Sequence, residues 1–247
     1  MLSTGAALFQ VLMSLLLINS DLHSVLIYSP MRLLLLGVTG RTGRHLLQAA
    51  LEGAHEVTVV VRDQSKLQPH AALKIIEGDV MQPQTLLQAA KGCEAIICVL
   101  NVSRTSDFPW SPLRSPKNLL SVTMQHNIHA AKEWGIGRLV YCSAWGAAES
   151  KKDIPGWFRF FINNSNIGAA YKDHERAEAL LQGSSLDYTI VRPTGLTNSL
   201  NDKPVLVSIH NQPRPHLTIS RRNLARFLLR ITEHGTYRQQ VIAVSAA

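Results

Sequence analysis

The chain of 247 residues is poor in cysteine and has no hydrophobic run as long as those that cross membranes. A spanning helix needs about 20 apolar residues, and the apolar segment at residues 6–19 is shorter. The three cysteines, Cys93, Cys98 and Cys142, lie in or beside apolar strands without metal-ligand spacing. We therefore expect them to pack in the core of a protein from a reducing compartment, with neither a disulfide nor a metal.

Lysine and arginine are absent from the first thirty residues and begin at Arg32. A secretory signal would carry positive charge near its start, so the segment does not fit that class. We predict an apolar extension over residues 1–30, ahead of a working start at Met31, and a cytoplasmic domain over residues 31–247. The alternative is a membrane-associated N-terminal helix formed around residues 6–19.

Repeats and low-complexity linkers are also missing, and the length and the 46% hydrophobic composition suit one large α/β domain. The net charge is +8, yet the basic residues are scattered and form only short pairs such as Lys151-Lys152 and Arg221-Arg222. This scatter disfavours nucleic acid as a partner. An anionic cofactor explains part of the charge.

The most informative motif is LLLLGVTGRTGR at residues 33–44, in which an apolar run stops at three glycines spaced three apart. Gly37 would permit a tight turn, Gly40 would let the backbone approach a pyrophosphate, and Gly43 would let a new helix pack on its strand. Helix N–H groups would then face the anion. The motif predicts a dinucleotide site, against the simpler alternative of a turn that only needs positive φ.

Strands and helices alternate along the rest of the chain. Apolar runs predict strands over residues 33–36, 56–61, 73–77, 95–100, 138–142, 187–191 and 240–244. Helical spacing predicts helices over residues 44–53, 82–91, 117–134 and 221–233, the last capped by Ser220. The pattern predicts a Rossmann-type, doubly wound parallel sheet in a single domain, with ligands bound beyond the carboxyl ends of the strands.

The residue after the second strand selects between dinucleotides, because an acidic side chain there binds the ribose whereas arginine binds a 2′-phosphate. Here that residue is Arg62, and Asp63 is placed to cap a short helix instead. Arg41 and Lys66 could add positive charge near the same phosphate. We therefore expect NADP rather than NAD. The alternative is that Arg62 is a solvated residue at a strand exit.

Several segments together resemble the atypical short-chain dehydrogenase/reductase superfamily. They are GVTGRTG at 37–43, VVVRD at 59–63, GDV at 78–80, CSA at 142–144, DYTIVRPTGL at 187–196 and ISRRNLARFLL at 219–229. Over residues 31–244 the chain is most similar to the NADPH-dependent flavin reductase/biliverdin IXβ reductase group, within the NmrA-like NAD(P)H-binding families. The motifs are specific in combination and weak singly.

The resemblance implies a set of cofactor contacts. It places the pyrophosphate at the glycine turn, the 2′-phosphate at Arg62, the adenine at Asp79 and Val80, the ribose and linker at Leu100 and Asn101, and the nicotinamide at Ser143. The full set of candidate cofactor-binding residues is Gly37, Thr39, Gly40, Arg41, Thr42, Gly43, Arg62, Asp79, Val80, Leu100, Asn101, Ser143 and Pro193. Asp79 has an alternative role as the cap of the following helix.

The chain departs from typical short-chain dehydrogenases, which use a Tyr-x-x-x-Lys pair to move a proton. The residue four after Tyr171 is Glu175, and this segment precedes the helix where the pair is expected. His174 matches a histidine of the flavin reductase group, whereas Gly195 replaces a second one. Ser143 and His174 are the catalytic candidates, and the alternative for His174 is an ordinary exposed residue at a helix start.

These features favour an NADPH-dependent oxidoreductase that passes hydride to a planar conjugated acceptor such as a flavin, tetrapyrrole or quinone. Orientation of two rings then carries the reaction, and solvent can supply the proton. The alternative is a non-catalytic NADP(H) sensor or assembly factor, as occurs among NmrA-like relatives. We expect a small-molecule acceptor as the partner and a monomer or homodimer.

Residues 145–166 are the one irregular region, with Trp157, Phe158, Phe160 and Phe161 between polar stretches. The segment is long for a connection in a compact domain. It could be a flap over the substrate, a surface for a partner, or an aromatic cluster that seals one end of the sheet.

Overall fold

The computed structural model describes residues 29–247, and its centre is an eight-stranded sheet. In spatial order the strands are β3 (Leu73–Glu77), β2 (Glu56–Val61), β1 (Arg32–Leu36), β4 (Ala95–Cys98), β5 (Arg138–Cys142), β6 (Asp187–Pro193), β10 (Gln240–Ala246) and β8 (Val205–Ser208). All neighbours are parallel except β8, which runs antiparallel to β10. The predicted Rossmann-type doubly wound sheet is confirmed.

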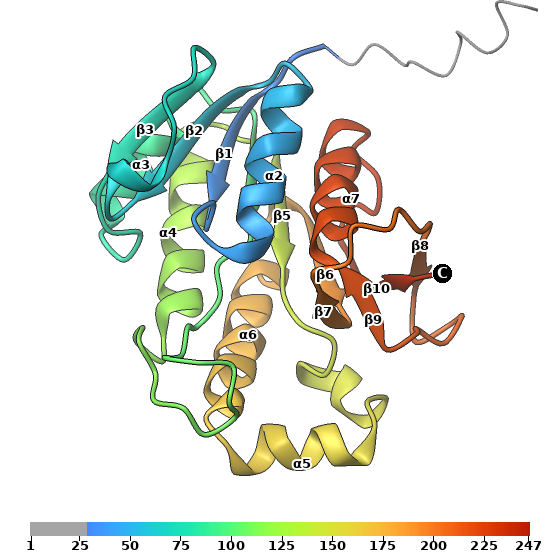
Figure 1. Ribbon diagram of the computed structural model, residues 1–247. Coiled ribbons are helices and arrows are strands. Elements are labelled where there is room, and N and C mark those ends of the chain that lie inside the picture. The colour runs from blue at the N-terminus through green and yellow to red at the C-terminus, as the bar shows by residue number, and fades with distance from the viewer. Residues whose placement is uncertain (1–28) are drawn as a thin grey trace, which may run out of the picture.

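Helices cover both faces of this sheet (Figure 1). Helices α2 (Arg41–Glu52) and α7 (Arg221–Glu233) pack side by side on one face, and α3 (Pro83–Ala90), α4 (Leu119–Glu133) and α6 (Ile167–Gln182) lie on the other. Successive leucines of β1 point to opposite faces, so Leu33 joins one core cluster and Leu34 the other. Burial on both faces explains why β1 is a continuous apolar run.

The element boundaries differ from the sequence-based ones at several points. Helix α2 begins at Arg41 rather than at residue 44, and β4 ends at Cys98 rather than at residue 100. The short strands β7 (Gly195–Thr197), β8 and β9 (Thr218–Ser220) were not predicted. Strands of three or four residues are too short to show a periodic pattern, which is why the sequence does not reveal them.

The region at residues 145–166 is not an irregular connection, and that prediction was wrong. It contains the 3-10 helix η3 (Ala148–Lys152) and helix α5 (Gly156–Asn164), which lies across the molecule beyond the carboxyl ends of the strands (Figure 1). Only Ile162 of α5 is buried. A helix with a single buried position shows no clear apolar stripe, so its spacing did not predict it.

Two predicted caps are confirmed. Ser220 Oγ accepts a hydrogen bond from the N–H of Asn223 at 3.1 Å and begins α7. Asp63 Oδ1 accepts from the N–H of Ser65 at 3.1 Å and begins the 3-10 helix η2 (Gln64–Lys66). The carboxyl group of Asp63 therefore serves the backbone of its own turn.

The three cysteines lie in the core, as expected. All are buried, and burial raises the pKa of the Cys98 and Cys142 thiols to about 12. Thiols with such pKa values are poor nucleophiles, so these two side chains act as small apolar groups. Within residues 29–247 no helix is both long and apolar enough to cross a membrane. The predictions for the apolar N-terminal segment lie outside the described residues.

Candidate functional site

A cleft of about 460 Å³ opens at the carboxyl ends of β1, β2, β4 and β5. It gathers almost all of the predicted site residues. Those among its lining are Gly37, Thr39, Gly40, Arg41, Thr42, Gly43, Arg62, Asp79, Val80, Leu100, Asn101, Ser143 and His174. Pro193 is not in the lining, and its carbonyl oxygen accepts the N–H of Trp145 at 3.0 Å. Parallel strands end at one edge of a sheet, so segments far apart in the sequence meet there.

The glycine turn has the geometry that a phosphate cradle needs. Gly37 has φ +91°, a conformation that other residues rarely adopt, and a Cβ on Gly43 would lie 2.0 Å from the carbonyl oxygen of Gly37. The first glycine is thus required for the turn and the third for packing of α2 on it. Gly40 is the N-cap of α2 and provides no side-chain cap, so the first N–H groups of the helix are left for an anion.

Arg62 lies at the cleft, exposed at the end of β2, and forms no ion pair within residues 29–247. Lys66 does not line the cleft and instead lies 3.4 Å from a carboxylate oxygen of Asp63. The acid next to Arg62 is therefore engaged by its own turn. A phosphate would find a guanidinium free of ion pairs there, whereas Lys66 lies outside the cleft lining.

Arg41 lines the cleft but is already paired. Both of its terminal nitrogens lie 2.8 Å from the carboxylate oxygens of Asp107, which belongs to the loop at residues 101–118. The hydrogen bonds from Arg41 hold the pKa of Asp107 below its usual range. Arg41 therefore ties this loop to the start of α2, and its added charge beside Arg62 stays a prediction.

Sequence reasoning missed Arg104, Asp107 and Arg221, which also line the cleft. Arg221 is buried at the start of α7 and donates to Oδ1 of Asn198 at 2.7 Å. Burial lowers its pKa, and the nearby charge of Arg41 lowers it further. Nothing in the local sequence marks Arg221, because it reaches the cleft only through the packing of α7 beside α2.

Ser143 and His174 both present a buried polar atom that has no partner within residues 29–247. Ser143 follows β5, and its N–H donates to the carbonyl of Val191 at 2.8 Å while its Oγ remains unpaired. His174 is 1% exposed in the middle of α6, so the alternative of an exposed helix-start residue is wrong. Its Nδ1 lies 2.7 Å from the hydroxyl of Tyr141, and its Nε2 is unpaired.

Burial fixes the charge state of His174. Removal from water lowers the pKa of the imidazole to about 3, so the ring is neutral at physiological pH. A neutral ring with one nitrogen bonded to Tyr141 offers a hydrogen bond through the other. Burial thus disfavours the protonated ring in the folded protein, and a role of His174 in supplying charge or a proton stays a prediction.

The segment around Tyr171 lies within α6 rather than before a helix, because Gly168 and Ala170 already belong to its buried face. The hydroxyl of Tyr171 donates to the carbonyl of Trp145 at 3.3 Å, outside the cleft lining. Asp173 accepts a hydrogen bond at 2.6 Å from the N–H of Leu120, in the first turn of α4. Neither side chain replaces the missing proton-transfer pair.

Asp79 lines the cleft and does not cap α3. Its Oδ1 accepts the N–H of Met81 at 2.9 Å, and the N-cap of α3 is Gln82. The alternative role proposed for Asp79 is thus wrong in detail, since its bond closes a turn before the helix.

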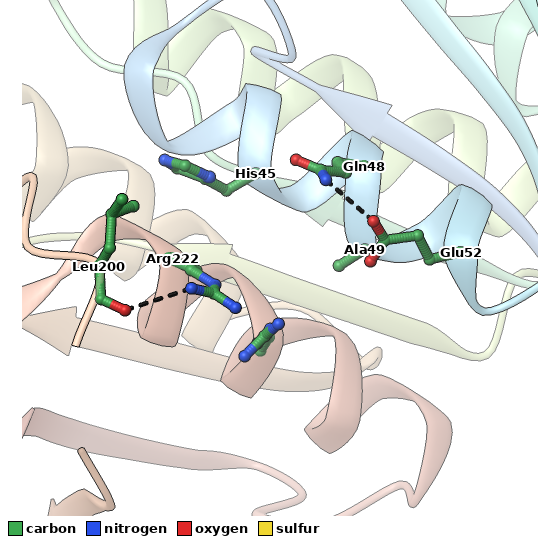
Figure 2. Close-up of a pocket in the computed structure, with 7 residues that line it drawn as sticks. His45, Gln48, Ala49, Glu52, Leu200 and Arg222 are labelled. Carbon is green, nitrogen blue, oxygen red and sulfur yellow. Dashed lines mark hydrogen bonds between the residues drawn. The ribbon is translucent and has the colours of Figure 1, made fainter. Parts of the chain in front are cut away.

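Two other hollows lack such features. One, of about 260 Å³ between α2 and α7, has polar side chains that are already bonded: Gln48 to Glu52 at 2.9 Å, and Arg222 to the Leu200 carbonyl at 3.2 Å (Figure 2). The other, of about 510 Å³, contains Arg192, which is bonded to two carboxylates. Neither contains a glycine turn, so the cleft at the strand ends is the candidate site.

A parallel sheet in this strand order, with a glycine turn between β1 and α2, defines a dinucleotide-binding α/β protein. The chain belongs to the NAD(P)H-binding family, whose model matches residues 37–235. NAD(P)H is therefore the cofactor class, and the glycine cradle and the two unpaired buried atoms fit such a group.

Curated relatives are distant. The chain is 26% identical over 215 residues to the photosystem II assembly factor Ycf39 of Synechocystis sp., covering 82% of this chain and 59% of the relative. It is 30% identical over 173 residues to Ycf39 of Guillardia theta, covering 69% of this chain and 48% of the relative. The chain thus spans about half the length of these assembly factors. It is also 26% identical over 172 residues to the uncharacterized sugar epimerase YhfK of Bacillus subtilis, covering 68% of this chain and 73% of YhfK.

Solved structures share the fold. ChuY, described as an anaerobillin reductase of Escherichia coli O157:H7, superposes with a TM-score of 0.72 at 22% identity, covering 87% of this chain and 97% of ChuY. A short-chain dehydrogenase/reductase of Veillonella parvula, solved in complex with NADP, superposes with a TM-score of 0.71 at 19% identity. The match covers 88% of this chain and 95% of that protein. At such identities the likeness establishes the fold alone.

Proposed function

We propose that this protein is an NADPH-dependent reductase that delivers hydride to a planar conjugated acceptor such as a flavin, tetrapyrrole or quinone. The observation that carries the proposal is the pair of unpaired buried atoms, Ser143 Oγ and His174 Nε2, in the same cleft as the glycine turn. An unpaired buried polar group costs about 1–3 kcal/mol. A ligand that bonds to both atoms regains that cost, so the pair supports a binding role.

The preference for NADPH over NADH rests on Arg62. Its guanidinium is free of ion pairs within the described chain and follows the second strand, where a 2′-phosphate would lie. The side chain that would bind a ribose hydroxyl is that of the neighbouring Asp63. Its Oδ1 already accepts hydrogen bonds from the N–H and the hydroxyl of Ser65. Charge and hydrogen bonding therefore both favour the phosphorylated dinucleotide.

The residues of the cleft orient and hydrogen-bond rather than transfer protons. NADPH, when bound, supplies the hydride. The neutral ring of His174 and the hydroxyl of Ser143 are positioned to bond to a carboxamide or an acceptor oxygen, and Tyr141 fixes the ring through Nδ1. Water would supply the proton, which suits an acceptor whose conjugated system can hold the added charge.

The direct test is oxidation of NADPH, followed by absorbance, with FMN, biliverdin and a quinone supplied separately. A binding titration of NADPH against NADH accompanies it. Turnover with one of the acceptors would support the proposal and begin to identify the substrate. Absence of turnover with all three, together with tight NADPH binding, would contradict it.

That second result would support a different function, a non-catalytic NADP(H) sensor or assembly factor. The similarity to relatives named as assembly factors favours this candidate, as does the absence of a Tyr-x-x-x-Lys pair at Tyr171. In such a protein the same cleft would bind the dinucleotide and change the surface offered to a partner, without consuming the cofactor.

A further inference from the structure

Exposed aromatic side chains gather on one surface next to the cleft. We define the aromatic patch as the exposed Phe108 and Trp110 of the loop at residues 101–118, the exposed Trp157 and Phe160 of α5, and the half-buried Phe161 of α5 that contacts three of them. Trp157 is 63% exposed, Phe108 62% and Phe160 57%. Among the described residues half of the eight exposed large hydrophobic side chains belong to this patch. A concentration of this kind marks a binding surface rather than ordinary scatter.

The patch is built as one unit, although its residues come from two segments, with Trp110 and Trp157 47 positions apart in the sequence. The rings of Trp110 and Phe161 have their centroids 5.7 Å apart, and Phe161 also contacts Trp157 and Phe160. Trp110 Nε1 donates to the carbonyl of Asn164 at 2.8 Å, which ties the loop to the end of α5. The exposed rings are thus held in place before any partner arrives.

Basic residues lie in the chain segments that carry the aromatic rings. Within the loop at residues 101–118 and the stretch at residues 145–166, six basic side chains form no ion pair with any part of residues 29–247. They are Arg104, Arg114, Lys117, Lys151, Lys152 and Arg159. The acids there are mostly neutralised, since Asp107 pairs with Arg41 and Glu149 with Arg192. Only Asp153 remains to offset the basic side chains.

We propose that the aromatic patch docks the protein peripherally on a membrane surface containing anionic lipids. Tryptophan and phenylalanine insert favourably at the boundary between headgroups and acyl chains, and flanking lysines and arginines are attracted by anionic headgroups. A second copy of this chain is a poorer occupant, because two such patches would bring like charges together. The first described residues lie at the opposite end of the sheet from α5 (Figure 1).

The patch is continuous with the site already described. The loop at residues 101–118 contributes Arg104 and Asp107 to the cleft and Phe108 and Trp110 to the patch. Docking through this loop would therefore bring the mouth of the cleft to the lipid surface. Molecules dissolved in the membrane would then be within reach of the cleft.

The first test is sedimentation of the full-length protein with lipid vesicles. We expect binding to vesicles of phosphatidylcholine with phosphatidylglycerol, and much weaker binding to phosphatidylcholine alone. The double variant Trp157→Ala/Phe160→Ala should lose at least about tenfold in affinity, since both side chains are largely exposed and their burial in lipid is favourable. Leu200→Ala/Leu217→Ala removes similarly exposed apolar groups elsewhere and should bind like the parent.

The apolar segment at residues 6–19 could also attach the chain to vesicles, so the second test locates the contact. Brominated phosphatidylglycerol quenches tryptophan that enters the lipid. Trp157→Phe should lose much of the quenching, whereas Trp134→Phe, directly after α4 and outside the patch, should not. Quenching that depends on Trp157 supports the proposal even if the Trp157→Ala/Phe160→Ala variant still sediments with the vesicles.

Two results would overturn the proposal. One is failure of the full-length protein to bind anionic vesicles, which would point to a protein partner with an acidic, apolar face instead. The other is vesicle binding with quenching that is unchanged in Trp157→Phe, which would assign the attachment to another part of the chain.

Discussion

The two sides of the cleft are built in different ways. The dinucleotide side consists of backbone, since the turn at residues 37–43 and the start of α2 offer N–H groups from one short stretch. The other side consists of side chains, since Ser143 follows β5 and His174 lies in α6. Local sequence therefore determines the first side, whereas the second depends on how distant elements pack.

The two sides also differ in what they cost the protein in the absence of ligand. The glycine turn is closed by its own hydrogen bond, from the N–H of Gly40 to the carbonyl of Gly37 at 3.0 Å. Ser143 and His174 instead keep unpaired polar atoms in a buried place. Such atoms are normally paired, so the second side carries a penalty that a bound ligand would relieve.

The largest expected effect is on dinucleotide binding at the side of the cleft that the backbone of residues 37–43 forms. Gly40→Leu should weaken binding of NADPH and NADH alike by about 100-fold or more, because a side chain at the helix start would displace the phosphates. Losing two charge-assisted hydrogen bonds, each worth about 1.5–3 kcal/mol, gives that magnitude. Fluorescence titration with both dinucleotides measures it.

The matched control is Gly137→Leu, at an exposed glycine where an added Cβ meets nothing within 4 Å. It should bind both dinucleotides normally. Retained affinity in Gly40→Leu would remove the glycine turn from the phosphate site.

The second effect concerns His174, on the side of the cleft that is built from side chains, and appears as a dependence of stability on pH. The pKa of His174 is lowered to about 3 in the folded protein and returns to about 6.5 on unfolding. The unfolded state therefore binds the extra proton between these values, so stability is complete above pH 6.5 and falls as the pH drops toward 3. At pH 5 the loss is about 2 kcal/mol.

His174→Gln provides the comparison, because it removes the titrating ring and leaves every acidic side chain in place. Thermal unfolding followed by circular dichroism between pH 7.5 and 5 should show a steeper loss for the parent than for this variant. Parallel curves would mean that the ring is solvated in the folded protein.

The sequence predicts the backbone side far better than the side-chain side. The alternation of strands with helices, the role of Gly43 and the capping role of Asp63 all follow from patterns within a few residues. The burial of His174 does not, because it arises when α6 packs against β5 and brings the ring to Tyr141, 33 residues away. The pairing of Arg41 with Asp107 likewise requires the loop to fold back over α2.

A third effect separates the cofactors. Arg62→Ala should weaken NADPH binding about tenfold and leave NADH binding unchanged, because only NADPH carries the phosphate that this guanidinium would bond. The value is set at the low end because Arg62 is exposed. Lys66→Ala removes an equal charge outside the cleft and should change neither affinity. Equal losses for both dinucleotides in Arg62→Ala would overturn the NADPH preference.

The smallest expected effect separates stability from function at Ser143. Ser143→Ala deletes an unpaired buried oxygen and no existing hydrogen bond, so the free energy of unfolding without ligand should stay the same or rise. With ligand bound, the variant lacks one hydrogen bond of about 1 kcal/mol, so kcat/KM or cofactor affinity should fall about fivefold. Ser121→Ala is the matched control, because its hydroxyl bonds to Asp173 at 2.6 Å and its loss should lower stability without changing cofactor affinity. If Ser143→Ala instead lowered stability and kept full cofactor affinity, the Ser143 hydroxyl would stabilise the folded core. Other residues of the cleft would then make the ligand contacts.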